Sequence, residues 1–183
     1  LLRTNAGRMD GMTYEGKYFF VDTAGIFAYG RFDQTESTYV KIVGTPTQDY
    51  VLMEVVSPPA DYTPLDNTHV EGVRKIDYTN RKVWYEPCKN EKEDTFKGAN
   101  VVPKDPRFMT QREGRLYIAG SDDNDDTVYI TDSGNPYYFP VVLSMQLPPN
   151  SDRISGLSVF NNAIIVGRRF DVHAITGDTN RTD

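Results

Sequence analysis

The sequence predicts an all-β fold, an antiparallel meander of short strands in a propeller-like arrangement. Aromatic residues make up 12% of the 183 residues, with twelve Tyr and nine Phe. These residues fit a pleated, half-buried surface, as do Val, Ile and Thr. Fourteen Gly and eleven Pro are spread along the chain and separate short apolar runs. No segment combines a helical period with capping residues, so helices are not expected.

The first third of the chain is expected to form four strands, at residues 17–21 (KYFFV), 26–29 (IFAY), 38–43 (TYVKIV) and 50–56 (YVLMEVV). The first two flank the sequence DTAG, and a Gly-containing loop between two apolar runs predicts a hairpin. Pro58, Pro59 and Pro64 follow the fourth run. They indicate a stiff connection, because proline has no N–H group to donate to a sheet.

The middle third is expected to form five strands, at residues 73–78 (VRKIDY), 82–85 (KVWY), 107–111, 115–119 (RLYIA) and 127–131 (TVYIT). Residues 86–105 are polar, charged and bounded by Pro and Gly, so one long irregular loop is expected there. Within it, residues 89–97 (KNEKEDTFK) mix both signs of charge. A solvated excursion is favoured for this stretch, and a docking loop for a partner is the alternative.

The last strands are expected at residues 154–160 (ISGLSVF), 163–166 (AIIV) and 170–175 (FDVHAI). Asn161 and Asn162 separate the first two runs, and they predict a two-residue hairpin turn because Asn tolerates positive φ. Strands spaced roughly 8–12 residues apart are typical of a sandwich, a barrel or a propeller.

Three segments share one plan of turn, apolar strand, polar loop and second strand: residues 16–30, 113–134 and 160–178. A propeller blade of about 42 residues would place about four blades in the chain. The alternative is that any antiparallel meander produces such a similarity between segments. We expect one β-rich domain over residues 1–183 that is part of a longer polypeptide, because both ends look cut. We expect either a closed small propeller or a slice of a larger one.

The composition excludes several classes of function. The net charge of −6 argues against nucleic acid as the main partner, because phosphate binding needs clustered Lys and Arg. No apolar run approaches the ~18 residues of a membrane span. Cys88 is the single cysteine, which excludes an intrachain disulfide framework. With His69 and His173 as the two histidines, a zinc site is close to excluded, and no cofactor, metal or catalytic residue is assigned.

Residues 121–127 (SDDNDDT) form the densest acidic cluster. Asp122, Asn124 and Asp126 match the first three alternating oxygen ligands of a calcium loop. The match then ends, because Thr127 stands where the loop requires Gly and Ser133 where it requires Glu. A solvated hairpin loop is therefore favoured, and calcium binding is the alternative.

Two further groups are candidates for catalysis. Cys88 is expected to be inert, because neither histidine is near it in sequence to act as a base. Asp171 and His173 share one face of a strand and could form a general-base pair. Because no nucleophile motif accompanies them, a hydrogen-bonded histidine at a strand edge is favoured.

An aromatic group offers two interpretations. It is either a platform for a sugar or packing within the core, and the second is more common in β-rich proteins. The residues are Trp84, Tyr85, Tyr137, Tyr138 and Phe139.

Residues 115–178 carry a resemblance to a known family. They read RLYIAGSDDNDDTVYITDSGNPYYFP, then a Pro-rich gap, then ISGLSVFNNAIIVGRRFDVHAITGD. This stretch resembles a recurrent segment of bacteriophage tail and neck proteins, which are β-propeller-like virion proteins that include the nozzle proteins of short-tailed phages. It departs from the family pattern at Thr131, where a Ser is expected before Asp132. The resemblance implies that Asp132, Gly134, Asn135 and Pro136 shape a turn.

The resemblance implies a mechanical function in the virion. The chain would be a structural component of a phage tail, at the nozzle or the end of the tail tube, made in the host cytoplasm and not an enzyme. Its partners would be further copies in a ring and an adaptor, portal or tail protein. DNA would pass transiently without specific binding, and the acidic charge would suit a channel wall that repels DNA.

Two alternatives remain open. The first is a propeller-like binding module that recognises glycan or protein, for which exposed aromatic residues near loops 85–100 and 121–127 would be the sign. The second is a polysaccharide hydrolase, which needs two carboxylates about 5–10 Å apart. Asp122, Asp126 and Asp132 are the candidates for that pair.

Overall fold

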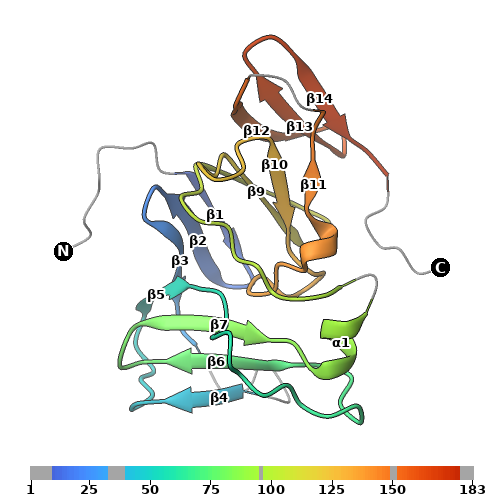
Figure 1. Ribbon diagram of the computed structural model, residues 1–183. Helices are drawn as coiled ribbons and strands as arrows, with labels where there is room; N and C mark the ends of the chain where they lie inside the picture. Colours follow the sequence, from blue (N-terminus) through green and yellow to red (C-terminus); the bar gives the residue numbers. More distant parts are fainter. Residues whose placement is uncertain (1–9, 33–39, 95–96, 149–151, 178–183) are drawn as a thin grey trace.

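The computed structural model describes residues 10–32, 40–94, 97–148 and 152–177. Over these residues the chain folds almost entirely as β-structure, and its strands form three sheets of seven, four and three strands (Figure 1). The predicted all-β class is therefore confirmed.

The largest sheet joins the N-terminal half of the chain. Its spatial order is β1-β2-β3-β5-β7-β6-β4. Its strands are β1 (Asp10–Tyr14), β2 (Lys17–Asp22), β3 (Gly25–Gly30), β4 (Val40–Val43), β5 (Val51–Val55), β6 (Val73–Asp77) and β7 (Lys82–Glu86). The predicted hairpin of residues 17–21 and 26–29 is confirmed as β2 and β3. Strand β1 was not predicted, and residues 38–39 of the third predicted strand lie outside the described residues.

The expected antiparallel arrangement holds for four of the six pairings of this sheet, and the other two pairings are parallel. Strand β4 pairs with β6, and β5 pairs with β7 through only two residue pairs, Glu54 with Lys82 and Val55 with Val83. Parallel neighbours need a long crossover, and the proline-containing connection of residues 56–72 supplies one. Strands β4, β6 and β7 run across the molecule while β1–β3 run steeply (Figure 1), so the sheet changes direction at this short pairing.

The two smaller sheets are antiparallel meanders. The four-stranded sheet has the order β11-β10-β9-β8, and the three-stranded sheet the order β12-β13-β14. Their strands are β8 (Phe108–Arg112), β9 (Arg115–Ala119), β10 (Thr127–Ile130), β11 (Met145–Gln146), β12 (Ile154–Phe160), β13 (Ala163–Arg168) and β14 (Val172–Ile175). Asn161 and Asn162 have φ of 46° and 58°, which confirms the predicted two-residue turn.

The propeller-like part of the prediction is not confirmed. The four-stranded sheet has the size of one propeller blade, but the three sheets differ in strand number and two pairings are parallel. The propeller arrangement and the single domain stay predictions.

Two hydrophobic cores lie on opposite faces of the four-stranded sheet. One face of β8 and β9, with Met109, Leu116 and Ile118, packs against the seven-stranded sheet. The other face, with Phe108, Tyr117 and Ala119, packs against the three-stranded sheet. All five residues of β9 are therefore buried, which explains why its sequence lacks the alternation of a strand with one wet face.

The long loop predicted for residues 86–105 is not wholly irregular. Residues Lys89–Glu93 form the short helix α1, and the carboxylate of Glu91 accepts a hydrogen bond from the backbone N–H of Cys88 at 3.0 Å. Glu91 is buried. The expected absence of helices is therefore wrong at this point. The other four residues of the helix are exposed, which agrees with a solvated excursion. The only other helical segment among the described residues is a 3₁₀ turn at Val141–Leu143.

Asn100 joins the returning part of this loop to the main core. Its buried amide donates to the carbonyls of Tyr85 at 2.8 Å and Tyr137 at 3.0 Å, and it accepts a bond from the N–H of Phe139 at 2.8 Å. One side chain thus satisfies three backbone groups that are shut away from water.

Replacing Asn100 with Ala is expected to lower the free energy of unfolding by about 2–4 kcal/mol, because three buried backbone groups lose their partners. Urea denaturation followed by circular dichroism measures this. Asn90→Ala is the matched control, since the Asn90 amide also donates to two carbonyls but is exposed, and it should cost less than about 1 kcal/mol. Equal losses in the two variants would contradict the role assigned to Asn100.

Candidate functional site

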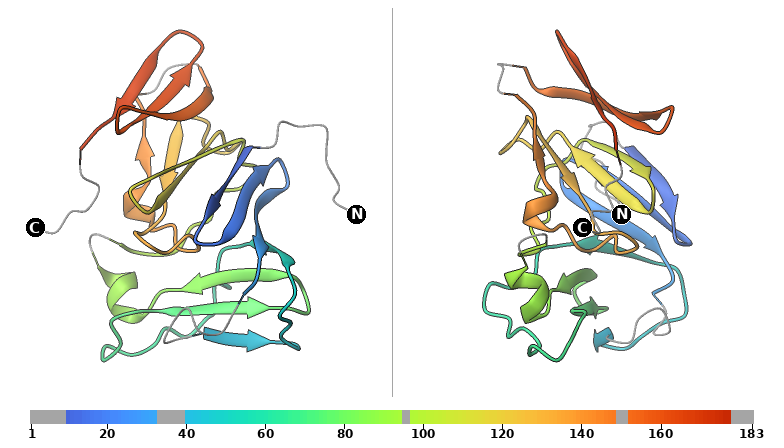
Figure 2. Two further views of the ribbon diagram at one scale, coloured as in Figure 1. Left: turned by 180° about the vertical axis from the view of Figure 1, so that it is seen from behind. Right: turned by 90° about the vertical axis from the view of Figure 1, so that its right-hand side faces the viewer.

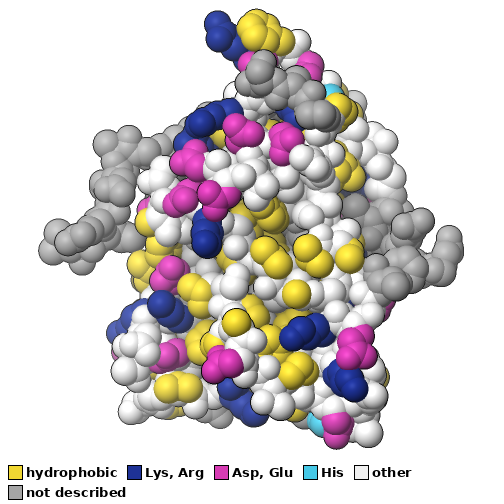
Figure 3. All heavy atoms as spheres, viewed as in Figure 1, with side chains coloured by type: hydrophobic (Ala, Val, Ile, Leu, Met, Phe, Trp, Pro, Cys, Tyr) yellow, Lys and Arg dark blue, Asp and Glu magenta, His cyan; other side chains and the backbone are white. Residues whose placement is uncertain are grey.

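The acidic loop of residues 121–127 joins β9 to β10, and its carboxylates are engaged by arginines. Asp122 forms an ion pair with Arg107 and lies 3.5 Å from Arg153, whose Nε is 3.2 Å from Asp125. Figure 3 shows acidic side chains gathered with basic ones in the upper part of the face. These pairs are exposed and each contributes little to stability.

The three residues proposed as calcium ligands point to separate protein partners. Asn124 donates to the hydroxyl of Tyr129 at 3.1 Å, and Asp126 accepts from Gln146 at 3.1 Å. Across the described ranges, no group of three or more His, Cys, Asp or Glu side chains could hold a metal ion. The structure therefore supports the solvated loop and gives no support to a calcium site at Asp122, Asn124 and Asp126.

The carboxylates considered for a hydrolase are not brought together as a trio. Asp126 directly precedes β10, whereas Asp132 follows its other end. Six residues of extended chain separate them by roughly 20 Å. Asp132 is instead 3.1 Å from the ammonium group of Lys97 and 3.6 Å from Arg115. The pair of Asp126 and Asp132 is thus outside the spacing that glycoside hydrolysis requires.

The turn implied by the family resemblance is present at residues 132–136. Asp132 and Asn135 form an isolated bridge, and Gly134 has a φ of 68°. The N–H of Asn135 donates to the carbonyl of Asp132 at 3.2 Å, which closes the turn. Gly134 supplies the positive φ without steric cost.

A polar cluster lies between this turn and helix α1. Lys97 is 3.6 Å from Glu91 and 3.1 Å from Asp132, so one ammonium group bridges two carboxylates from distant parts of the chain. Burial alone would lower the pKa of Lys97, but the charges of the two carboxylates outweigh the effect of burial, so the pKa is raised. The stretch of residues 89–97, for which a solvated excursion was favoured and a docking loop was the alternative, is thereby tied at Lys97 to the turn at Asp132.

The aromatic group considered as a sugar platform is mostly core. Tyr85, Tyr137, Tyr138 and Phe139 are buried, and the rings of Tyr85 and Tyr138 lie 4.9 Å apart. Trp84 is half-buried. The core interpretation is therefore confirmed for the four buried residues, which cannot stack on a sugar from solution.

Two of these hydroxyls sit close to a buried carboxylate. Tyr85 donates to Glu91 at 2.9 Å and accepts a bond from the N–H of Gly72 at 2.7 Å, and Tyr138 donates to the carbonyl of Gly98 at 2.6 Å. Burial, with the charge of Glu91, raises the pKa of Tyr85 and of Tyr138 far above the ordinary value. Both are neutral hydrogen-bond donors in the folded chain.

The remaining candidates for catalysis are Cys88 and the pair of Asp171 and His173. Cys88 is buried, its thiol donates to the carbonyl of His69 at 3.3 Å, and burial raises the pKa of that thiol. A raised pKa opposes thiolate formation, as expected for an inert cysteine. His173 lies 3.3 Å from Asp171, so the predicted pair is formed, on and beside strand β14.

One exposed surface was missed by the sequence analysis, the outer face of the three-stranded sheet. Figure 2 shows this sheet as a separate layer at one end of the molecule. Ile164, Val166 and Ile175 point inward into the second core. The strand registers place eight residues on the opposite side: Gly156, Ser158, Phe160, Ala163, Ile165, Gly167, Val172 and Ala174.

This outer face has no charged side chain among those eight residues. Phe160 is 65% exposed and Val172 is 69% exposed. A Cβ placed on Gly156 would meet no atom within 4 Å, so the surface is open there. An exposed antiparallel sheet usually alternates polar and apolar residues, and an uncharged apolar face marks a surface for a partner. The signal in the sequence was that β12 and β13 carry apolar or small residues at both alternating sets of positions.

The edge strand of the same sheet, β14, is partly open, although Arg112 donates to the carbonyl of Ile175 at 3.3 Å at the end of the strand. Within the described part of the chain, β14 pairs with β13 alone. Its sequence, VHAI, has no proline and no lysine or carboxylate to block addition of another strand. The outer face and this edge together form what we call the end-sheet surface, made of the eight residues above and strand β14.

Comparison with protein-family models, with curated proteins and with solved structures found no match. In the described segments, no helix is long and apolar enough to cross a membrane.

Calcium is expected to leave the thermal midpoint unchanged when it is added at millimolar concentration, because Asp122 pairs with arginines and Asp126 accepts from Gln146 instead of converging on one point. A ligand that bound the folded state would raise that midpoint. Differential scanning fluorimetry with and without a chelator makes the comparison. A calcium-dependent rise in the thermal midpoint that the variant Asp126→Asn abolishes would contradict this expectation and support a calcium site.

Stability is expected to fall as the pH rises above about 10, where tyrosines of an unfolded chain ionise. Burial raises the pKa of Tyr14 and of Tyr62 to about 12. Between those two pH values the unfolded chain binds fewer protons than the folded chain, so the free energy of unfolding decreases.

Thermal melts from pH 8 to pH 12 test this decrease. Tyr62→Phe should make the fall shallower, and Tyr29→Phe, whose ring is exposed, should leave it unchanged. A midpoint that stayed constant up to pH 12 in the unmodified chain would contradict the expectation.

Proposed function

We propose that this chain is a structural component of a bacteriophage tail, at the nozzle or the end of the tail tube, and that it works by assembling with copies of itself and with neighbouring virion proteins. The observation that carries the proposal is the end-sheet surface, which is uncharged, apolar and open. It lies within residues 115–178, the stretch that resembles tail and neck proteins, and that stretch spans strands β9 to β14.

The composition of this surface favours a packed partner over a soluble ligand. A sheet face without charged side chains is poorly suited to orient a small polar molecule, but it can pack against another sheet at about 10 Å. If the end-sheet surface of one copy meets a different surface of the next, this head-to-tail contact closes into a ring when the rotation between copies allows it. The surplus of carboxylates, with a net charge of −6, suits the wall of a channel that DNA crosses without being held.

The proposal assigns no catalytic residue, cofactor or metal. Its partners are further copies of the chain and an adaptor, portal or tail protein, and its location is the virion. An enzyme that degrades polysaccharide receives no support from the candidate carboxylates, since Asp132 lies far from Asp126.

The solution mass of the purified chain, measured by light scattering across a range of concentrations, tests this proposal. A discrete ring is expected, on the order of six to twelve copies. Val172→Asp should shift it to monomer, because a buried unpaired carboxylate strongly opposes association. Val70→Asp is the matched control, since Val70 is 81% exposed but lies far along the chain from the end sheet. A monomer at every concentration, or equal effects of both variants, would count against the assembly role.

A further inference from the structure

A second face of the molecule is aromatic and partly exposed, and it lies on the far side of strands β2, β3 and β5 from the main core. Its Tyr18 and Tyr29 are exposed, Phe27 is half-buried and Phe20 is buried. Tyr18 pairs with Tyr29, and Tyr29 in turn lies opposite Leu52. In the next row Phe20 pairs with Phe27, which lies opposite Glu54. Cross-strand partners share a face, so these side chains form a grid on the side opposite to Phe19, Val21 and Met53.

The rings of this grid lie close to one another. Phe20 and Phe27 are stacked with centroids 5.3 Å apart, and Tyr18 stacks on Phe20 at 6.0 Å. Tyr18 can lie over the neighbouring strand because Gly11 there has no side chain, since a Cβ on Gly11 would come within 2.8 Å of the Tyr18 hydroxyl oxygen. Strand β2 therefore carries aromatic side chains on both its core face and its outer face.

Tyr50 extends the grid beyond β5. Its ring is 5.7 Å from the ring of Tyr29, and the guanidinium of Arg31 lies 5.4 Å from its centroid. Tyr18, Tyr29 and Tyr50 are 40%, 47% and 58% exposed. Three tyrosines therefore present ring surface and hydroxyl groups to solvent while their neighbours restrict them. Such restriction lowers the conformational entropy that these side chains lose when a ligand binds.

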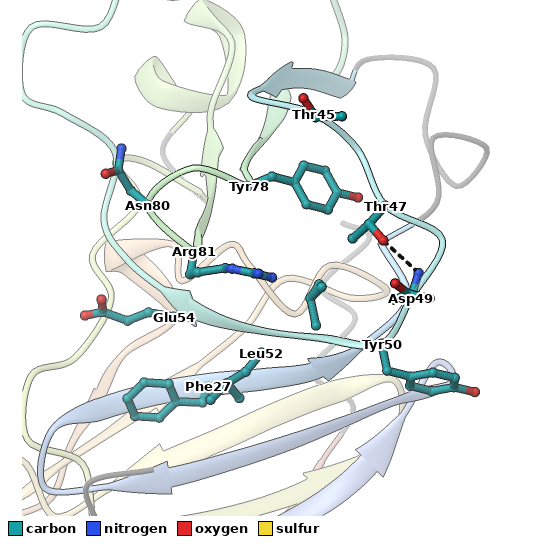
Figure 4. Close-up of a pocket in the computed structure, with 11 residues that line it drawn as sticks. Phe27, Thr45, Thr47, Asp49, Tyr50, Leu52, Glu54, Tyr78, Asn80 and Arg81 are labelled. Carbon is teal, nitrogen blue, oxygen red and sulfur yellow. Dashed lines mark hydrogen bonds between the residues drawn. The ribbon is translucent and has the colours of Figure 1, made fainter. Parts of the chain in front are cut away.

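A polar pocket of about 710 Å³ opens beside this grid. Figure 4 shows Phe27 and Leu52 on one side of it, and Arg81 reaching across toward Thr47 and Asp49. The pocket forms where the large sheet changes direction between β5 and β7. Its lining combines carboxylates, a guanidinium, an amide and hydroxyls: Glu54, Asp49, Arg81, Asn80, Thr45 and Thr47.

We propose that this aromatic grid and pocket form a binding site for a neutral polysaccharide chain. The C–H groups on the face of a sugar ring are apolar and match the negative face of an aromatic ring. The hydroxyls of a sugar both donate and accept, and the pocket offers acceptors at Asp49 and Glu54 and a donor at Arg81, while the Asn80 amide donates to Asp77 at 2.7 Å. From β2 to β5 the grid is about 10 Å wide, as two strand spacings require, and it continues to Tyr50.

The charges around the site select a neutral ligand over the other candidates. Two cations, Arg31 and Arg81, are balanced by Asp49 and Glu54. Recognition of a nucleic-acid backbone would need a surplus of cations. An apolar protein surface would leave the tyrosine hydroxyls and the pocket groups without partners, which is costly once they are buried.

This inference does not depend on the proposed function. The grid lies on the seven-stranded sheet, whereas the assembly surface is the three-stranded end sheet, so each can fail without the other.

Isothermal titration calorimetry of the whole chain with maltohexaose, cellohexaose, chitohexaose and xylohexaose tests the site. Saturable binding to at least one of these neutral oligosaccharides is expected. Tyr50→Ala and Tyr29→Ala should each weaken that binding about tenfold, equivalent to about 1.4 kcal/mol. Both side chains are exposed, so the variants should fold, and an unchanged thermal midpoint verifies it.

Two controls separate the site from the rest of the molecule. Phe170→Ala removes an exposed aromatic ring from the turn before β14 and should leave binding unchanged. Val172→Asp should alter the solution mass without altering the affinity for the sugar. Absence of binding to all four sugars overturns the inference, and so does binding that Tyr50→Ala and Tyr29→Ala leave intact. A change of solution mass in Tyr50→Ala without sugar binding would make the grid a contact between copies instead.

Discussion

The burial of strand β9 on both faces is the constraint on which the rest of the structure depends. Leu116 and Ile118 point to one core while Tyr117 and Ala119 point to the other. Because the four-stranded sheet is covered on both sides, the seven-stranded sheet and the end sheet must lie on opposite sides of it. Two bonds reinforce the first contact: the hydroxyl of Tyr14 donates to the carbonyl of Gly114 at 2.7 Å, and the N–H of Met109 donates to Asp10 at 3.2 Å. The two proposed surfaces are therefore separated by the whole thickness of the molecule.

Buried polar side chains bind the irregular segments to this framework. Asn100 satisfies three backbone groups, and Lys97 bridges Glu91 and Asp132. These groups come from segments far apart in sequence. The effect is that the turn at residues 132–136 and the segment around helix α1 are fixed relative to each other, although neither contains a long regular element.

Local patterns predicted local structure well. Asn161 and Asn162 specify their turn through φ, and most strands fall within a residue or two of the predicted ranges. The parallel pairings of β4 and β5 were missed, because they join segments separated by a proline-rich connection and no local residue records them. The acidic loop illustrates the same limit, since Arg107 and Arg153 occupy its carboxylates from remote positions. The outward row of Tyr18, Phe20, Phe27 and Tyr29 was in principle visible, as the alternate positions of two predicted strands. It was overlooked because aromatic residues filled both sets of positions.

The uncharged outer face of the end sheet has a consequence for how the chain behaves in solution. Repulsion between copies rests on the net negative charge carried elsewhere on the surface, and this charge vanishes near the pI of about 5.0. Copies then approach without a long-range barrier, and the apolar face is free to make contacts that are not the native ones. The same surface that suits ordered assembly at neutral pH thus makes mildly acidic conditions those in which the free chain is least soluble.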